Sequence, residues 1–197
     1  NVLSLAKTSV FRLGLVSAVC LTVSLWSTTR SVAAPPLQLK DGDRVVLIGD
    51  GLIEQEQYFG WVEVMLTTDF PDADATFRNL GWNADRPDGA SRFGLSLLQA
   101  GHEPADEGLK QLRKQLDLTQ PTVAVLGYGM AVALEISELD AADRPAALEQ
   151  FGKQLHDLIV QIQSTQPNAR FVLLSPIAPV GNSVLTKDVL DAVCERI

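Results

Sequence analysis

The sequence predicts an α/β domain in which a parallel sheet is covered by helices on both faces. Short apolar runs rich in β-branched residues, such as 44–48 and 122–126, are typical of strands buried on both sides. Segments with apolar residues at helical spacing lie between these runs, the longest at 144–166. Strands that alternate with helices favour parallel pairing, because each helix returns the chain to the same edge of the sheet.

The first predicted strand, 44–48, lies between the polar turn Asp41-Gly42-Asp43 and the break Gly49-Asp50-Gly51. A helix is predicted over 52–70, where Glu and Gln separate apolar residues at roughly helical spacing, and Pro71 ends it. The second strand is predicted over 75–80.

Residues 81–104 contain several Gly and Pro residues among small and polar ones, which predicts a long surface loop. Such loops are uncommon in compact domains unless they have a function. An amphipathic helix is predicted over 105–118 and a third strand over 122–126, followed by a Gly-rich break.

The remaining elements are predicted from the same patterns. The helix 144–166 has one apolar face and precedes a fourth strand over 170–175, which Pro176 closes. Residues 185–197 complete the series as a last helix. We see no internal repeat.

Composition limits the classes of function. The 197 residues predict one domain of ordinary size, and a net charge of −8 disfavours nucleic-acid binding, which depends on clustered Lys and Arg. The two cysteines, Cys20 and Cys194, do not form a disulfide framework, and Cys194 is interpreted as an incidental thiol. His102 and His156 have no second ligand at a familiar spacing, so we expect neither a metal site nor a cofactor.

The N-terminal segment has the pattern of an export signal. Lys7 and Arg12 precede an uncharged apolar run over 13–26, and small residues follow at 31–34. We expect residues 1–34 to be a secretory signal peptide, 35–42 a linker and 43–197 the domain, delivered to the periplasm or secreted. The alternative is an uncleaved membrane anchor, the one membrane contact we expect. Because the chain begins at Asn1 and stops just after a predicted helix, we also expect a fragment whose domain is truncated at its C-terminus.

In parallel α/β sheets the ligand crevice lies beyond the carboxyl ends of the strands. The residues placed there are Gly49-Asp50-Gly51, Gly81-Trp82-Asn83, Gly127-Tyr128-Gly129 and Ser175-Pro176. We therefore expect the pocket to be lined by Trp82, Asn83, Tyr128, Gly129 and Ala131, with a small-molecule ester or carbohydrate-like ligand as the candidate partner.

Three of these blocks resemble the SGNH hydrolases, also called the GDSL lipase/esterase family. The run 45–54 is similar to the family's first block, 77–82 to the second, which ends in Asn-x-Gly, and 122–130 to the third. The likeness extends from about Asp43 to Pro179, and 49–82 also resembles exported relatives from environmental bacteria such as planctomycetes. The resemblance implies a three-layer, flavodoxin-like fold and an ancestral activity on ester bonds.

The chain departs from the family at each catalytic position. The resemblance implies a serine nucleophile where this sequence has Gly51, and an oxyanion-binding Asn where it has Gly129 or Ala131, depending on the alignment. It also implies a late Asp-x-x-His, which the sequence lacks. The backbone N–H groups of Gly51 and Gly81 are the oxyanion-hole donors that remain.

Other side chains offer weak substitutes. Ser91, Ser96 and Ser175 are available, but none follows the tight strand-to-helix turn that exposes a nucleophile. Asp50 is interpreted as a cap of the following helix rather than as a base that activates water. We expect Asn79 and Asn83 to hold the loop through bonds to the backbone, and Trp61 and Trp82 to pack in the core and loop, although Trp82 could line the crevice.

The sequence thus supports a catalytically impaired SGNH-like domain that has become a binding or scaffold domain. The first alternative is an active acyl or acetyl esterase that uses a non-standard nucleophile or water. The second is a phosphate-binding turn at Gly49-Asp50-Gly51, which lacks a basic partner and ranks last.

Overall fold

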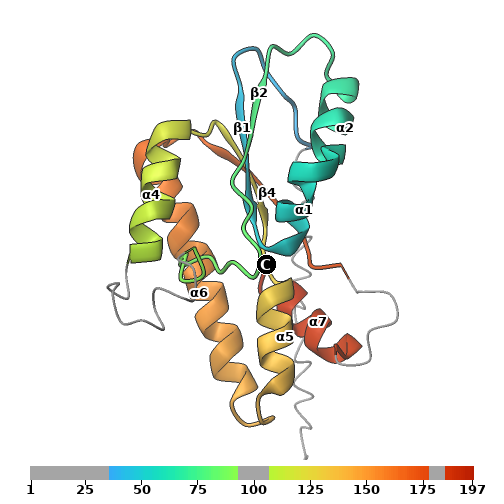
Figure 1. Cartoon of the computed structure of the whole chain (residues 1–197), viewed down its shortest axis with the longest axis vertical. Helices are drawn as coiled ribbons and strands as arrows, with labels where there is room; N and C mark the ends of the chain where they lie inside the picture. Colours follow the sequence, from blue (N-terminus) through green and yellow to red (C-terminus); the bar gives the residue numbers. More distant parts are fainter. Residues whose placement is uncertain (1–35, 93–106, 178–184) are drawn as a thin grey trace, which may run out of the picture. The chain divides into compact units, whose positions relative to one another are not determined.

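The computed structural model describes residues 36–92, 107–177 and 185–197. Four parallel strands form one sheet in the order β2-β1-β3-β4 (Figure 1). Their bounds are Arg44–Gly49 for β1, Thr76–Asn79 for β2, Val123–Gly127 for β3 and Arg170–Leu173 for β4. The central pair β1 and β3 runs in register from Val45 opposite Val123 to Gly49 opposite Gly127. The predicted α/β class with a parallel sheet is therefore confirmed.

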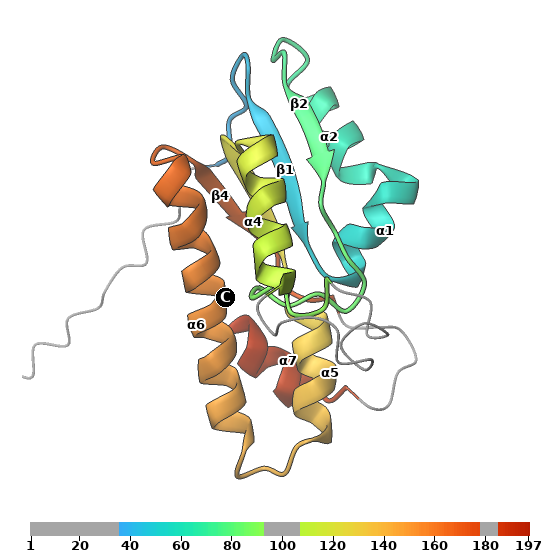
Figure 2. The same cartoon turned by 60° about the vertical axis from the view of Figure 1, so that its left-hand side comes forward.

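Helices cover both faces of this sheet (Figure 2). Helices α1 and α2 contribute to the apolar cluster on one face, and the other four helices contribute to the cluster on the opposite face. The bounds are Gly51–Phe59 for α1, Trp61–Asp69 for α2, Glu107–Thr119 for α4, Met130–Glu138 for α5, Arg144–Thr165 for α6 and Lys187–Cys194 for α7.

Alternation along β1 divides the core into its two clusters. Val45 and Leu47 pack in one cluster with Ile53 of α1. Val46 and Ile48 pack in the other cluster, together with residues of α4, α5, α6 and α7. Burying a Val, Leu or Ile side chain contributes about 1.5–3 kcal/mol to the stability of the fold. The alternating side chains of β1 therefore hold helices against both faces of the sheet. Leu39, in the predicted linker 35–42, packs with the first of these clusters.

The structure corrects three predicted elements. The predicted helix 52–70 is two helices, because Gly60 adopts φ 65° between α1 and α2. Helix α5 occupies part of the predicted Gly-rich break. The predicted surface loop 81–104 is packed inward in its described half, where Asp85 and Arg92 are buried.

Within the described ranges, no helix is long and apolar enough to cross a membrane. The predicted export signal, Cys20, Ser96 and His102 lie outside those ranges, so the prediction of export stays a prediction.

Candidate functional site

The carboxyl ends of β1 and β3 bring two of the predicted segments together. The N–H of Asp50, directly after β1, donates to the carbonyl of Gly127 at the end of β3, with an N···O distance of 3.0 Å. Between β1 and β2 the chain crosses one face of the sheet through α1 and α2, and between β2 and β3 it crosses the opposite face through α4. Such a change of direction in an open α/β sheet is where a crevice forms.

The Asp50 carboxylate binds the start of α5. Its Oδ2 atom accepts the backbone N–H groups of Gly129, Met130 and Ala131 at 3.1, 2.9 and 3.1 Å. Asp50 occupies the predicted N-cap position of α1, where the N–H of Glu54 donates to its carbonyl at 2.9 Å, but its side chain makes no cap hydrogen bond there. The helix whose N–H groups the carboxylate binds is α5. Burial raises the pKa of Asp50, although these three donors oppose the shift.

Gly51 is the first residue of α1 and has no conformational need to be glycine. Its φ is not positive, and a Cβ atom built on it would lie 3.6 Å from Asn83 Oδ1, an ordinary contact. A serine would therefore fit here. The position that the resemblance assigns to the nucleophile has no side chain, but the space for one is present.

A cavity of about 350 Å³ opens beside this turn. Its lining is mostly apolar and comes from helix α1, the start of α5 and the segments that follow β1, β3 and β4: Asp50, Gly51, Leu52, Gln55, Gly127, Tyr128, Met130, Leu174, Ser175, Pro176 and Ile177. No histidine is among them. His156 is exposed on α6, and no group of three or more His, Cys, Asp or Glu side chains that could hold a metal ion occurs within the described ranges.

Gly81 lies against the first turn of α1. Its N–H donates to Asn79 Oδ1 at 2.7 Å and its carbonyl accepts Gln57 Nε2 at 2.7 Å. Asn79 Nδ2 also donates to the carbonyl of Ile53, so the predicted side chain to backbone role of Asn79 is confirmed. An oxyanion bound by Gly81 would have to share an N–H that already has an acceptor.

A pair of alanine substitutions tests this packing. A Cβ at Gly81 would lie 2.4 Å from the backbone nitrogen of Glu54, so we expect Gly81→Ala to lower the free energy of unfolding by about 2 kcal/mol or more. Gly51→Ala, the matched control, should change it by less than about 0.5 kcal/mol. Urea unfolding measures both, and equal effects would contradict the close approach of Gly81 to α1.

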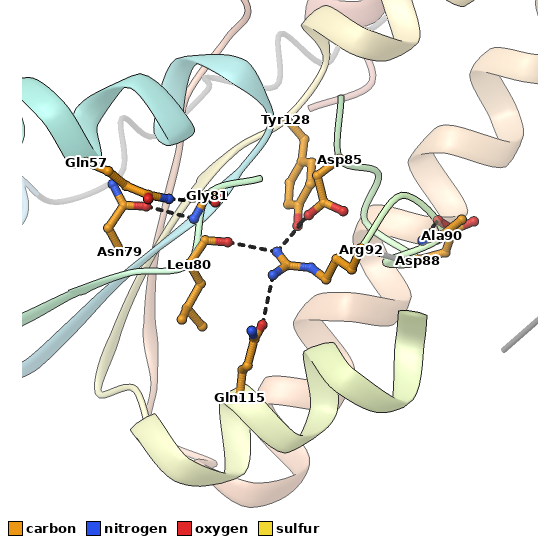
Figure 3. Close-up of polar contacts among 10 residues, drawn as sticks. All are labelled: Gln57, Asn79, Leu80, Gly81, Asp85, Asp88, Ala90, Arg92, Gln115 and Tyr128. Atoms are coloured by element: carbon orange, nitrogen blue, oxygen red, sulfur yellow. Dashed lines mark hydrogen bonds and ion pairs between the residues drawn. The ribbon is translucent and has the colours of Figure 1, made fainter. Parts of the chain in front are cut away.

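A buried ion pair holds the segment that follows (Figure 3). Arg92 Nη2 lies 2.7 Å from Asp85 Oδ2 and donates to the carbonyl of Leu80 at 2.9 Å, while Nη1 donates to Gln115 Oε1 at 2.8 Å. The Tyr128 hydroxyl also donates to Asp85 Oδ2, at 3.0 Å. Burial raises the pKa of Asp85 to about 6, against the opposing effects of Arg92 and Tyr128. Sequence reasoning missed this pair, whose signal was two opposite charges in a Gly- and Pro-containing segment.

The structure divides the predicted pocket residues between two places. Tyr128 borders the 350 Å³ cavity, whereas Trp82 and Asn83 line a second crevice of about 510 Å³. Gly129 and Ala131 line neither and instead donate to Asp50. Asn83 makes no hydrogen bond with the part of the chain described, contrary to its predicted role.

Trp61 also differs from its prediction. It is 62% exposed on α2 and does not pack in the core.

No protein-family model matches the chain, and no curated protein matches it. Solved structures do match. A variant of Axe2, an acetyl xylan esterase from Geobacillus stearothermophilus, superposes with a TM-score of 0.52 at 12% identity, over 81% of this chain and 74% of that one. The chain has the SGNH hydrolase fold. At this identity the likeness shows the fold alone.

Two further solved structures match at lower TM-scores. LAE5, an α/β hydrolase from the metagenome of Lake Arreo, matches at TM-score 0.48 and 18% identity, over 80% of this chain and 73% of that one. A gut microbial diltiazem-metabolizing enzyme also matches at 0.48 and 18%, over 82% of this chain. This chain spans 34% of that enzyme. Within the SGNH hydrolase fold, Gly51 stands at the strand-to-helix turn where the resemblance implies serine.

Proposed function

We propose that this protein is an exported SGNH-fold domain that binds a small-molecule ligand and does not hydrolyse it. The observation that carries the proposal is Gly51, a residue without a reactive atom at the start of α1, beside the 350 Å³ cavity. A nucleophile and its base act as a unit, so losing the nucleophile removes most of the rate. Export rests on the sequence pattern of residues 1–34.

Among the described residues, the surroundings of Gly51 offer no replacement base. Asp50 is 1% exposed, and its Oδ2 atom already accepts three N–H groups of α5. Taking a proton from water would weaken those bonds at a helix start, where a negative charge is favoured. The nearest carboxylate to the turn is therefore a structural group.

A hydrolysis assay tests the proposal. With p-nitrophenyl acetate, and with acetylated xylan because the matching Axe2 is an acetyl xylan esterase, we expect no saturable activity above a buffer control. Gly51→Ser should fold and still give no strong activity, because no histidine that could activate the added hydroxyl lines the cavity within the described ranges. Saturable hydrolysis by the unsubstituted protein would refute the proposal.

A second candidate is an active esterase that uses Ser175. One observation favours it: Ser175 lines the same cavity as Asp50 and Gly51. A serine-directed phosphonate should then label the protein at Ser175, and Ser175→Ala should abolish the label. The absence of any adduct would rule out a serine nucleophile and favour the non-catalytic proposal.

A further inference from the structure

The second crevice, of about 510 Å³, shares no lining residue with the cavity beside Gly51. It lies along α1 and the segment after β2, and is lined by Glu54, Gln57, Asn79, Leu80, Gly81, Trp82, Asn83, Arg92 and Gln115. Its volume is in the range of small-molecule sites. We propose that this crevice binds a neutral saccharide of one or two rings, an inference that rests on the proposed function and names its ligand class.

Trp82 provides the apolar surface for such a ligand. Trp82 is 43% exposed, although it is a large apolar residue. Its backbone N–H donates to the carbonyl of Gly49 at 3.0 Å, which fixes its position. An indole ring offers a flat apolar face with little conformational entropy to lose. The C–H face of a pyranose ring is the complementary surface.

The polar lining suits hydroxyl groups. Gln57, Asn83 and Gln115 each carry an amide, a group that both donates and accepts hydrogen bonds, as a sugar hydroxyl does. Gln57 Nε2 is bonded to the carbonyl of Gly81 and Gln115 Oε1 to Arg92, so these two amides offer mainly the oxygen of Gln57 and the nitrogen of Gln115 to a ligand. The amide of Asn83 is exposed and makes no hydrogen bond with the described residues, and it is therefore available to a ligand.

The charges disfavour an anionic ligand. Arg92 is the one cation among the described lining residues, and the buried carboxylate of Asp85 already neutralises it at 2.7 Å. Glu54 lines the same crevice and forms no ion pair within the described part of the chain. A phosphate or carboxylate would meet an uncompensated negative charge, whereas a neutral polyol would not.

The walls of the crevice are held before any ligand arrives. Asn79 ties the turn at Gly81 to the carbonyl of Ile53, and Gln57 bonds the carbonyl of Gly81. Arg92 holds the carbonyl of Leu80 from the other side (Figure 3). Preorganised polar groups lower the cost of ordering on binding, which is what a weak, shallow saccharide site needs.

Isothermal titration calorimetry of the purified protein tests the inference. The probes are cellobiose, maltose and xylobiose, each up to about 10 mM, enough to detect a Kd near 1 mM. We expect at least one to bind, and the anionic digalacturonate to bind more weakly. Trp82→Ala should weaken binding about tenfold or more, whereas Trp61→Ala, a control at an exposed tryptophan outside the crevice, should not change it.

Asn83→Ala provides a second test, since its exposed amide has no structural bond to lose. It should weaken binding severalfold and leave thermal unfolding unchanged. No binding by any neutral probe, equal binding by the Trp82→Ala protein, or a preference for digalacturonate would overturn the inference. The hydrolysis assay is independent of the binding assay. If the protein hydrolyses an ester and also binds a saccharide, only the proposed function is refuted. If it neither hydrolyses an ester nor binds a saccharide, only this inference is refuted.

Discussion

Replacing Arg92 with Met should lower the free energy of unfolding by about 3–5 kcal/mol at pH 7, the cost of leaving one partner of a buried ion pair uncompensated. The Asp85 side chain is fully buried and that of Arg92 is 3% exposed, so water cannot replace the lost cation. The hydrogen bonds from Arg92 to the Leu80 carbonyl and to Gln115 would disappear as well. Urea unfolding at fixed pH measures the effect.

The pH dependence of this loss has a definite sign. The pKa of Asp85 is raised to about 6 from 3.8, so its protonated form is favoured by folding. Its contribution to stability is fully present below about pH 4 and is lost as the pH rises through 6. Removing Arg92 raises that pKa further, and the Arg92→Met protein should therefore recover part of its stability at pH 5.

The double variant Asp85→Asn/Arg92→Met is the control. It removes both charges, so it should be more stable at pH 7 than Arg92→Met alone and should lose the slope between pH 5 and pH 7. A double variant that is no more stable than Arg92→Met would show that packing, rather than the unpaired charge, causes the loss.

The sequence predicted the elements whose signals are local. Residues 45–48 and 123–126 are apolar throughout because β1 and β3 are covered on both faces, and this property depends little on the rest of the chain. The helix break at Gly60 was missed because apolar spacing continues across it, and a single glycine inside a helical pattern is ambiguous.

Helix α5 was missed for a different reason. It follows Gly127-Tyr128-Gly129, which is typical of a loop, and it has no side-chain cap from a neighbouring residue. Its cap comes from Asp50, 79 positions before Gly129. A cap supplied by the fold rather than by the adjoining sequence has no local signal.

The positions of the candidate residues in the sheet could be predicted from the sequence, whereas their role in a site stays a prediction. The strand-end rule placed Asp50, Gly51, Gly81 and Tyr128 correctly at the carboxyl edge of the sheet. The hydrogen-bond partners around the site could not be predicted. The Tyr128 hydroxyl donates to Asp85, which pairs with Arg92, and only folding brings Tyr128 to that segment.

Replacing Asp50 with Ala should destabilise the protein by about 3 kcal/mol or more, because three backbone N–H groups at the start of α5 would lose their acceptor at once. Each unsatisfied buried donor costs about 1–3 kcal/mol, although water can reach part of this turn once the carboxylate is gone. Asp50→Asn should cost less, about 1–2 kcal/mol, since its amide oxygen still accepts but the charge near the helix start is lost. Urea unfolding of both variants at pH 7 measures this order.

Asp72→Ala is the matched control, since that aspartate is exposed and makes no hydrogen bond with the described residues; it should stay within about 0.5 kcal/mol of the unsubstituted protein. The comparison separates two roles for Asp50. If Asp50 is a structural cap, the Ala variant should lose more free energy of unfolding than the Asn variant. If the carboxylate serves to activate water, Asn should replace it with little change in the free energy of unfolding. Unchanged stability in both Asp50 variants would therefore return Asp50 to the list of candidate bases and weaken the case for a non-catalytic domain.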